Sequence, residues 1–207
     1  MTRILLVRHG HVAGINPERF RGRADLTLTD AGRREAELTA RRIAATWKPA
    51  AIYASPLSRC RDTGAAIGAP FGVVPAVLAG LLDIDYGEWQ GLTPHEAKAR
   101  WPAEHDLWHQ APDRATIPGG ETLHEVQVRV AAALAAVHAA HPRDTVVMVG
   151  HDSVNRIILL HALEAPLGNY WRIRQNPCAI NEIELDENGF VVVSVNQTDH
   201  LRETSAR

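Results

Sequence analysis

The stretch Ile4-Leu5-Leu6-Val7, followed directly by Arg8-His9-Gly10, is the part of the sequence that decides the fold. Four consecutive apolar residues of this kind are typical of a strand buried on both faces of a parallel sheet. The abrupt change to charged and polar residues predicts that the strand ends there. Ligands of open α/β sheets bind at the carboxyl ends of the strands, so we expect Arg8 and His9 at a functional edge.

Helical and strand-like segments alternate along the rest of the chain. Residues 29–47 and about 55–67 have helical patterns, and the buried run 51–54 lies between them. This order predicts parallel strands joined by right-handed crossovers. We therefore expect an α/β fold, a three-layer sandwich whose mostly parallel central sheet is flanked by helices. The further expected elements are a short strand near 73–77, one or two helices within 93–110, a capped helix over 122–141, a strand over 145–149, a helix over 154–163, and a hairpin of strands 180–185 and 190–195.

Length and composition predict a single domain over residues 1–207. With 45% hydrophobic residues, the 207-residue chain can form one full apolar core. The last residues, 201–207, are expected to be a frayed tail. The segment 11–28 has no hydrophobic period and contains several glycine and proline residues, so we expect a long loop there.

Charge and cysteine content limit the partners and the location. The formal net charge is −2, from 22 Lys and Arg residues against 24 Asp and Glu residues, and it suggests neither a nucleic-acid nor a membrane partner. Cys60 and Cys178 lie far apart, which is typical of a reducing compartment. No apolar run approaches the roughly 18 residues of a membrane span. We expect a cytoplasmic protein that is a monomer or a homodimer.

Two of the predicted strands lead into a histidine, His9 in the first case and His151 in the second. Arg59 lies on the helix that follows the strand 51–54. Because the carboxyl ends of parallel strands meet at one edge of a sheet, we expect these groups around one small pocket. Guanidinium groups match the oxygens of a phosphate dianion, and a neutral histidine beside them can attack phosphorus. The predicted partner is therefore a small phosphorylated substrate.

Five segments together resemble those of the histidine phosphatase superfamily, in its phosphoglycerate-mutase-like branch. They follow the family's order and cover nearly the whole chain. The segments are Arg8-His9-Gly10, Ser55-Pro56-Leu57-Ser58-Arg59, Asp83-Ile84-Asp85-Tyr86-Gly87-Glu88-Trp89-Gln90-Gly91, Pro118-Gly119-Gly120-Glu121-Thr122 and Val149-Gly150-His151. The resemblance implies a phosphatase of small phosphomonoesters that works through a phosphohistidine and needs no metal or other cofactor.

The resemblance also assigns catalytic roles to individual residues. His9 would be the nucleophile that takes the phosphoryl group. Arg8, Arg59 and His151 would hold the phosphate oxygens and stabilise the transition state. Asp83 stands where the family usually has glutamate, and it would protonate the leaving oxygen and then activate water.

Further residues are candidates for substrate binding. Arg21, with Gly22, is expected to contact the substrate anion from the long loop. Asn16 lies one position later than the asparagine that touches the phosphate in the family. Asp152 follows the second histidine, where it would contact the substrate or pair with a nearby arginine.

Two points have alternative interpretations. Asp85 and Glu88 are alternative proton donors, because an aspartate at 83 is one methylene shorter than the family's glutamate. Trp89, Trp101 and Trp108 either cover the site as a lid or belong to the core.

Three other functions are compatible with parts of the pattern. A mutase would return the phosphate from His9 to its substrate, although such mutases are typically longer than this chain. A metal-dependent hydrolase would use His9 and His11 in an H-x-H pair. A phosphoanion-binding module would need the arginines but neither the histidine nucleophile nor Asp83.

Overall fold

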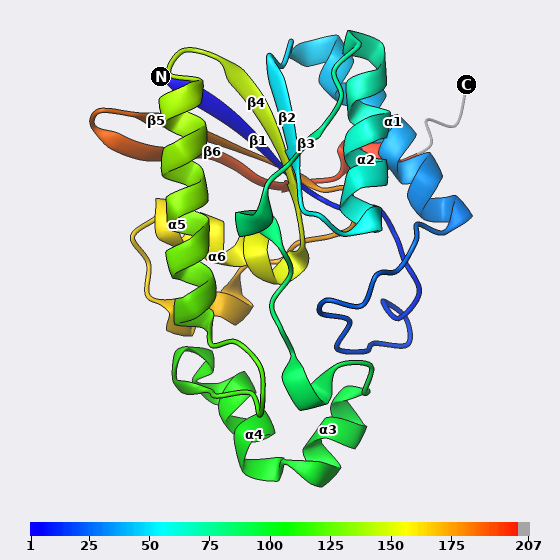
Figure 1. The fold of residues 1–207 in the computed structure, drawn as a ribbon, viewed down its shortest axis with the longest axis vertical. Coiled ribbons are helices and arrows are strands. Elements are labelled where there is room, and N and C mark those ends of the chain that lie inside the picture. The colour runs from blue at the N-terminus through cyan, green and yellow to red at the C-terminus, as the bar shows by residue number, and fades with distance from the viewer. Residues whose placement is uncertain (203–207) are drawn as a thin grey trace.

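A six-stranded sheet runs through the middle of the computed structural model, which describes residues 1–202 (Figure 1). The strand order is β3-β2-β4-β1-β5-β6. The first four of these strands are mutually parallel, and β5 and β6 are antiparallel to their neighbours. The strands are β1 (Thr2–Arg8), β2 (Ala51–Ala54), β3 (Ala76–Val77), β4 (Thr145–Gly150), β5 (Ile180–Asp186) and β6 (Gly189–Gln197).

Helices cover both faces of the sheet, which confirms the predicted three-layer α/β sandwich (Figure 1). On one face, Leu5 and Val7 of β1 pack with α1 (Asp30–Thr46) and α2 (Ser58–Gly68). On the other face, Ile4 and Leu6 pack with α5 (Leu123–Ala140) and α6 (Asp152–Ala162). All four β1 side chains are fully buried, and each such burial contributes about 2 kcal/mol to folding.

The helices begin where the sequence supplies caps. Thr122 and Glu125 form the expected capping box of α5, in which each side chain accepts a hydrogen bond from the other's backbone N–H. Thr93 and Glu96 form a second capping box at α3 (Pro94–Arg100). Helix α3 and α4 (Pro102–Gln110) lie apart from the layers that flank the sheet (Figure 1).

Two predicted boundaries are wrong. Helix α2 begins at Ser58 rather than near residue 55, because Asp25 of the long loop accepts hydrogen bonds from the backbone N–H and the hydroxyl of Ser58. The strand predicted over 73–77 is limited to 76–77. Val73 donates its N–H to Gly68 instead of to a strand, and Pro75 has no N–H to donate.

The tryptophans of the segment before α5 belong mainly to the core rather than to a lid. Trp89 is fully buried, Trp108 is 1% exposed, and Trp101 packs partly buried against the same cluster.

Within residues 1–202, no helix is long and apolar enough to cross a membrane.

Only the first two residues of the frayed tail predicted over 201–207 lie in the described part of the chain. Leu201 ends the short helix η6 (Asp199–Leu201), which contacts α1. Residues 203–207 lie outside the described part of the chain. The cytoplasmic location and the oligomeric state stay predictions.

Candidate active site

The two strand-end histidines meet, because β1 and β4 are adjacent and in register. Arg8 lies opposite Gly150, and the backbone N–H of His9 donates to the Gly150 carbonyl at 3.0 Å. The rings of His9 and His151 are 5.3 Å apart between centroids and inclined by 62°. Each histidine is only 1% exposed. His9 and His151 therefore lie side by side, as expected from the sequence.

His9 is held as a neutral ring with one free nitrogen. Its Nδ1 lies 2.7 Å from the Gly10 carbonyl oxygen, which can only accept, so Nδ1 carries the hydrogen. Nε2 keeps its lone pair. Burial holds the pKa of His9 well below its ordinary value of 6.5, and the neighbouring His151, Arg8 and Arg59 lower it further. A neutral imidazole with a free Nε2 is the form that attacks phosphorus.

Gly10 allows this close packing at the end of β1. A Cβ atom at this position would lie 2.4 Å from the carbonyl oxygen of Gly32 in α1. The backbone N–H of Gly10 donates to the Thr63 hydroxyl at 3.1 Å. The turn after His9 is therefore fixed against both helices of this face.

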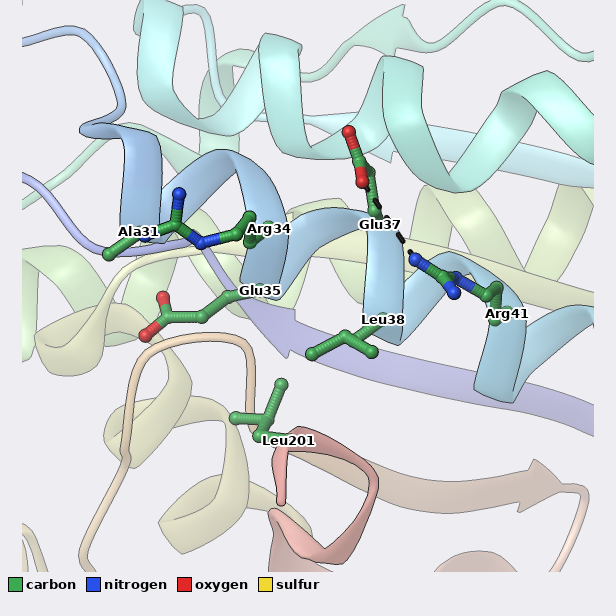
Figure 2. Close-up of a pocket in the computed structure, with 7 residues that line it drawn as sticks. All are labelled: Ala31, Arg34, Glu35, Glu37, Leu38, Arg41 and Leu201. Carbon is green, nitrogen blue, oxygen red and sulfur yellow. Dashed lines mark ion pairs between the residues drawn. The ribbon is translucent and has the colours of Figure 1, made fainter. Parts of the chain in front are cut away.

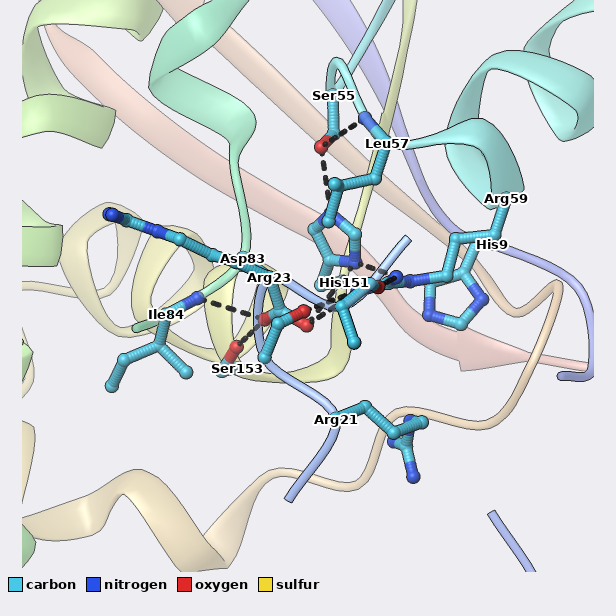
Figure 3. A network of polar contacts seen from close by, with 12 residues as sticks. His9, Arg21, Arg23, Ser55, Leu57, Arg59, Asp83, Ile84, His151 and Ser153 are labelled. Carbon is cyan, nitrogen blue, oxygen red and sulfur yellow. Dashed lines mark hydrogen bonds and ion pairs between the residues drawn. The ribbon is translucent and has the colours of Figure 1, made fainter. Parts of the chain in front are cut away.

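Arg59 is the fully buried centre of the polar network (Figure 3). Its guanidinium donates to the carbonyl oxygens of Ala24 at 2.7 Å and Gly22 at 2.8 Å. The same group donates to Asp83 Oδ2 at 3.0 Å and to His151 Nδ1 at 3.3 Å. Arg59 thereby joins the long loop, the second histidine and the carboxylate.

His151 is also neutral, but its hydrogen is on the other nitrogen. Because Arg59 Nε donates to Nδ1, the hydrogen lies on Nε2, which is 2.8 Å from the Ser55 hydroxyl. Burial lowers the pKa of His151 well below 6.5, and Arg59 and Arg8 act in the same direction. The 3.4 Å separation of His151 Nδ1 from Asp83 Oδ2 is therefore not an ion pair. The sequence did not identify Ser55 as a residue of the site. Its position directly after β2, at the sheet edge where the two histidines lie, is the signal that could have done so.

Asp83 is the carboxylate that faces the histidines. It is 7% exposed and lies between Arg59 and Ser153, whose hydroxyl is 2.5 Å from Oδ1 (Figure 3). Asp85 accepts instead from Arg23 at 3.0 Å, and Glu88 is exposed. Of the three predicted donors, Asp83 alone lines the pocket that contains His9.

The pocket beside His9 combines charged and aromatic side chains. Its lining residues are His9, Glu18, Arg19, Phe20, Arg21, Gly22, Asp83, Tyr86, Asp152, Ser153, Tyr170 and Trp171. Trp171 is 39% exposed and lies in the short helix η5 (Leu167–Arg172). No motif in the sequence indicated the aromatic wall, since its residues come from three separate segments.

Arg8, Arg21 and Gly22 lie around this pocket or directly behind it. Arg8 is 6% exposed, donates to the Gln175 carbonyl at 2.5 Å, and has no partner for its buried Nε among the described residues. Arg21 donates to the Gly14 carbonyl at 2.5 Å and lines the pocket. Gly22 contributes its carbonyl to Arg59.

The two remaining predicted binding residues differ in position. Asp152 lines the pocket, and its carboxylate pairs with Arg156 at 2.8 Å, so both expectations for it are compatible with its place. Asn16 is exposed and does not line the pocket, so its position gives no support to a phosphate contact.

The side chain of His11 is engaged elsewhere. His11 Nδ1 lies 3.0 Å from the Thr29 hydroxyl at the start of α1, so His11 does not pair with His9.

Among residues 1–202, no group of three or more His, Cys, Asp and Glu side chains is placed to hold a metal ion. Cys60 is fully buried, and burial raises the pKa of its thiol, as expected of a packed cysteine.

A second, shallower groove lies along α1 and is separate from this pocket (Figure 2). Glu37 and Arg41 are exposed and form an ion pair at 3.9 Å, whereas Glu35 is half-buried and accepts a hydrogen bond from the backbone N–H of His11 at 2.8 Å. Its lining residues are Ala31, Arg34, Glu35, Glu37, Leu38, Arg41 and Leu201. It contains neither strand-end histidine, so it is not the catalytic pocket.

Comparison with known proteins decides the family. The family model described as the histidine phosphatase superfamily (branch 1) matches residues 4–198 of the sequence. The chain belongs to this superfamily. The structure of Bacillus stearothermophilus YhfR superposes with a TM-score of 0.92 at 27% identity, over 98% of this chain and 100% of that chain. The predicted family, fold and enzyme class are confirmed.

Two of the curated relatives of this histidine phosphatase are named as phosphoserine phosphatases. Phosphoserine phosphatase 1 of Hydrogenobacter thermophilus is 28% identical over 98% of this chain and 96% of its own. The metal-independent phosphoserine phosphatase of Arabidopsis thaliana is 27% identical over 97% of this chain and 84% of its own. The bifunctional protein Rv2228c of Mycobacterium tuberculosis is 32% identical over 97% of this chain, which spans about half (55%) of that relative. The mutase alternative is not favoured.

The two neutral histidines predict a specific pH dependence of folding. In the unfolded chain each binds a proton near pH 6.5, whereas in the folded protein each stays neutral to well below that pH. Stability should therefore fall as the pH drops below about 6.5, by up to about 1.4 kcal/mol per pH unit for each histidine. Urea unfolding between about pH 7 and about pH 5.5 measures the slope. The variant His151→Gln should have a smaller slope, and an equal slope would contradict this assignment.

Proposed function

We propose that this histidine phosphatase hydrolyses O-phospho-L-serine, or a phosphomonoester of the same size and charge pattern, in two steps through His9. The observation that carries this proposal is a neutral nucleophile surrounded by phosphate-binding donors, with a carboxyl group close by. Arg8 and Arg59 would bind the phosphate oxygens, with His151 beside them. A dianionic phosphate would draw the Arg59 guanidinium away from Asp83, and the Asp83 carboxylate would then take up a proton from solvent and hold it beside the phosphate.

In the first step, the Nε2 lone pair of His9 forms a bond to phosphorus. The bond between phosphorus and the ester oxygen breaks, and its electron pair goes to that oxygen. The oxygen takes the proton from the carboxyl group of Asp83 and leaves as an alcohol. Arg59 and Arg8 stabilise the charge on the equatorial oxygens during the transfer.

In the second step, water attacks the phosphorus of phosphohistidine 9. Asp83, now a carboxylate, accepts a proton from this water. The bond between phosphorus and Nε2 breaks, and its electron pair returns to the His9 ring. Phosphate leaves, and both His9 and Asp83 are back in their starting forms.

Three further charged residues that line the pocket support a phosphoamino acid. Asp152 and Glu18 are carboxylates that suit an ammonium group, and Arg21 is a cation that suits a carboxylate. O-phospho-L-serine carries both groups next to its phosphate. Relatives that match this chain over nearly its full length are named phosphoserine phosphatases. A phosphoglycerate lacks the ammonium group, so Asp152 would repel rather than attract it.

A comparison of two substrates on the Asp152→Asn variant tests this proposal. For O-phospho-L-serine, KM should rise about tenfold, because a charge-assisted contact is lost. For 3-phosphoglycerate, KM should stay the same or fall. Assays of phosphate release with chelator present give both values, and Asp62→Asn on the exposed side of α2 is the control. Equal changes for both substrates would remove the ammonium role of Asp152.

A further inference from the structure

We propose that Ser153 is a positioning residue for Asp83: it fixes one carboxyl oxygen so that the catalytic proton is carried by the other, Oδ2. This inference rests on the proposed function, in which Asp83 is the proton donor. Ser153 follows Asp152 in the first turn of α6, and it is 3% exposed. It also lines the pocket next to His9.

The Oδ1 atom of Asp83 is fully occupied by hydrogen-bond donors. The Ser153 hydroxyl lies 2.5 Å from it, and the backbone N–H of Ile84 donates to it at 3.0 Å. A carboxyl oxygen has two lone-pair sites, and these two donors use both. The Ser153 hydroxyl has no other hydrogen-bond partner among residues 1–202. A proton on Oδ1 would displace one of these contacts.

The Oδ2 atom has room for a proton and faces the reacting groups. Arg59 donates to it at 3.0 Å, which uses one of its lone-pair sites. Among the described residues, no other hydrogen-bond donor uses the second site, because His151 Nδ1, 3.4 Å away, carries no hydrogen and already accepts from Arg59. Oδ2 therefore has the free site for the proton, on the side of the carboxyl group that faces His151 (Figure 3).

Ser153 compensates for the short side chain at position 83. Aspartate has one rotatable bond fewer than glutamate, so its carboxyl group cannot reach as far, and its orientation decides which oxygen meets the substrate. The Ile84 N–H lies on the same loop as Asp83, and Ser153 links this loop to α6. This contact does not involve Arg59, so it persists when the phosphate takes Arg59. Ser153 thus keeps the carboxyl group aimed during proton transfer.

The dependence of kcat/KM on the leaving group tests the role of Ser153, because kcat/KM covers only the steps up to release of the alcohol and leaves out the hydrolysis of phosphohistidine. The Ser153→Ala variant should lose about tenfold in kcat/KM on O-phospho-L-serine, because an alkoxide needs the proton to leave. On p-nitrophenyl phosphate kcat/KM should change by less than about twofold, because p-nitrophenolate leaves without a proton. Ser153→Thr keeps the hydroxyl and should recover most of the lost activity. Ser194→Ala removes a buried hydroxyl of β6 that has no partner among the described residues, and it is the matched control.

Three outcomes separate this inference from the proposed function. Equal losses on both substrates for Ser153→Ala, with an unchanged melting temperature, would show a merely structural role and overturn the inference. No loss on either substrate would overturn it as well. The Asp83→Asn variant is run in parallel: if it loses kcat/KM selectively on O-phospho-L-serine while Ser153→Ala does not, only the inference fails. If Asp83→Asn shows no selectivity, the assignment of the proton donor itself is wrong.

Discussion

Replacing His9 by alanine is expected to lower kcat by at least about 10⁴-fold on every phosphomonoester, because the nucleophile of the covalent intermediate is lost. Among the described residues, His9 is the histidine that lines the pocket, and the ring of His151 has both nitrogens engaged, by Arg59 and Ser55. Substrate binding should survive, since Arg8 and Arg59 remain. Phosphate release and isothermal titration measure the two quantities separately.

Trapping of the intermediate gives the control for this prediction. Acid-labile, alkali-stable labelling of the wild-type protein from a radioactive phosphomonoester is expected, and His9→Ala should not be labelled. The variant His124→Ala, which changes an exposed histidine of α5, should behave as the wild type does. Labelling of His9→Ala at the wild-type level would exclude His9 as the nucleophile.

Replacing Arg59 by methionine is expected to damage both catalysis and folding. The variant should lose about 10³-fold in kcat/KM, because a phosphate-binding donor is missing in the transition state. It should also lose about 3–5 kcal/mol of the free energy of unfolding, since Asp83 stays buried without its ionic partner. Two loop carbonyl oxygens lose their donor as well. Urea unfolding and assays of phosphate release measure these losses.

Two variants make the Arg59 prediction specific. Arg61→Met removes an exposed arginine of the same helix and should change neither activity nor stability by much. Arg59→Lys keeps the charge but has a single nitrogen, which cannot reach two carbonyls, a carboxylate and a histidine together. It should therefore recover only a small part of the lost activity. Full recovery would mean that charge alone explains the role of Arg59.

The centre of the fold could be predicted from the sequence because its signals are local. Residues 4–7 lie within a buried strand, and His9 follows the end of that strand. Neighbouring parallel strands bring such ends together. The helix at 122–141 was predicted with its capping box for the same reason. Position 75 shows the limit: a proline within an apparently β-type segment removes the donor that the strand needs.

The walls of the site could not be predicted, because they depend on contacts between distant segments. Trp171 and Tyr170 come from η5 and Phe20 from the long loop, and nothing in the local sequence of either segment indicates a pocket. Ser153 looks like an ordinary residue of the first helical turn until the loop of Asp83 is placed against it. Asn16 shows the converse, since a residue expected to contact the phosphate is exposed and does not line the pocket.

Arg59 recognises the long loop through its main-chain oxygens at Gly22 and Ala24, not through its side chains. The position of Arg59 beside the phosphate therefore does not depend on which side chains most residues of that loop carry. Side chains there can be exchanged to suit a different alcohol portion while the scissile bond stays in the same environment. Gly22 is the exception, since its φ of 48° is a conformation that other residues rarely adopt, and a Cβ atom there would lie 3.2 Å from the carbonyl oxygen of Ile84. Redesign of the substrate range should therefore begin with the other loop residues.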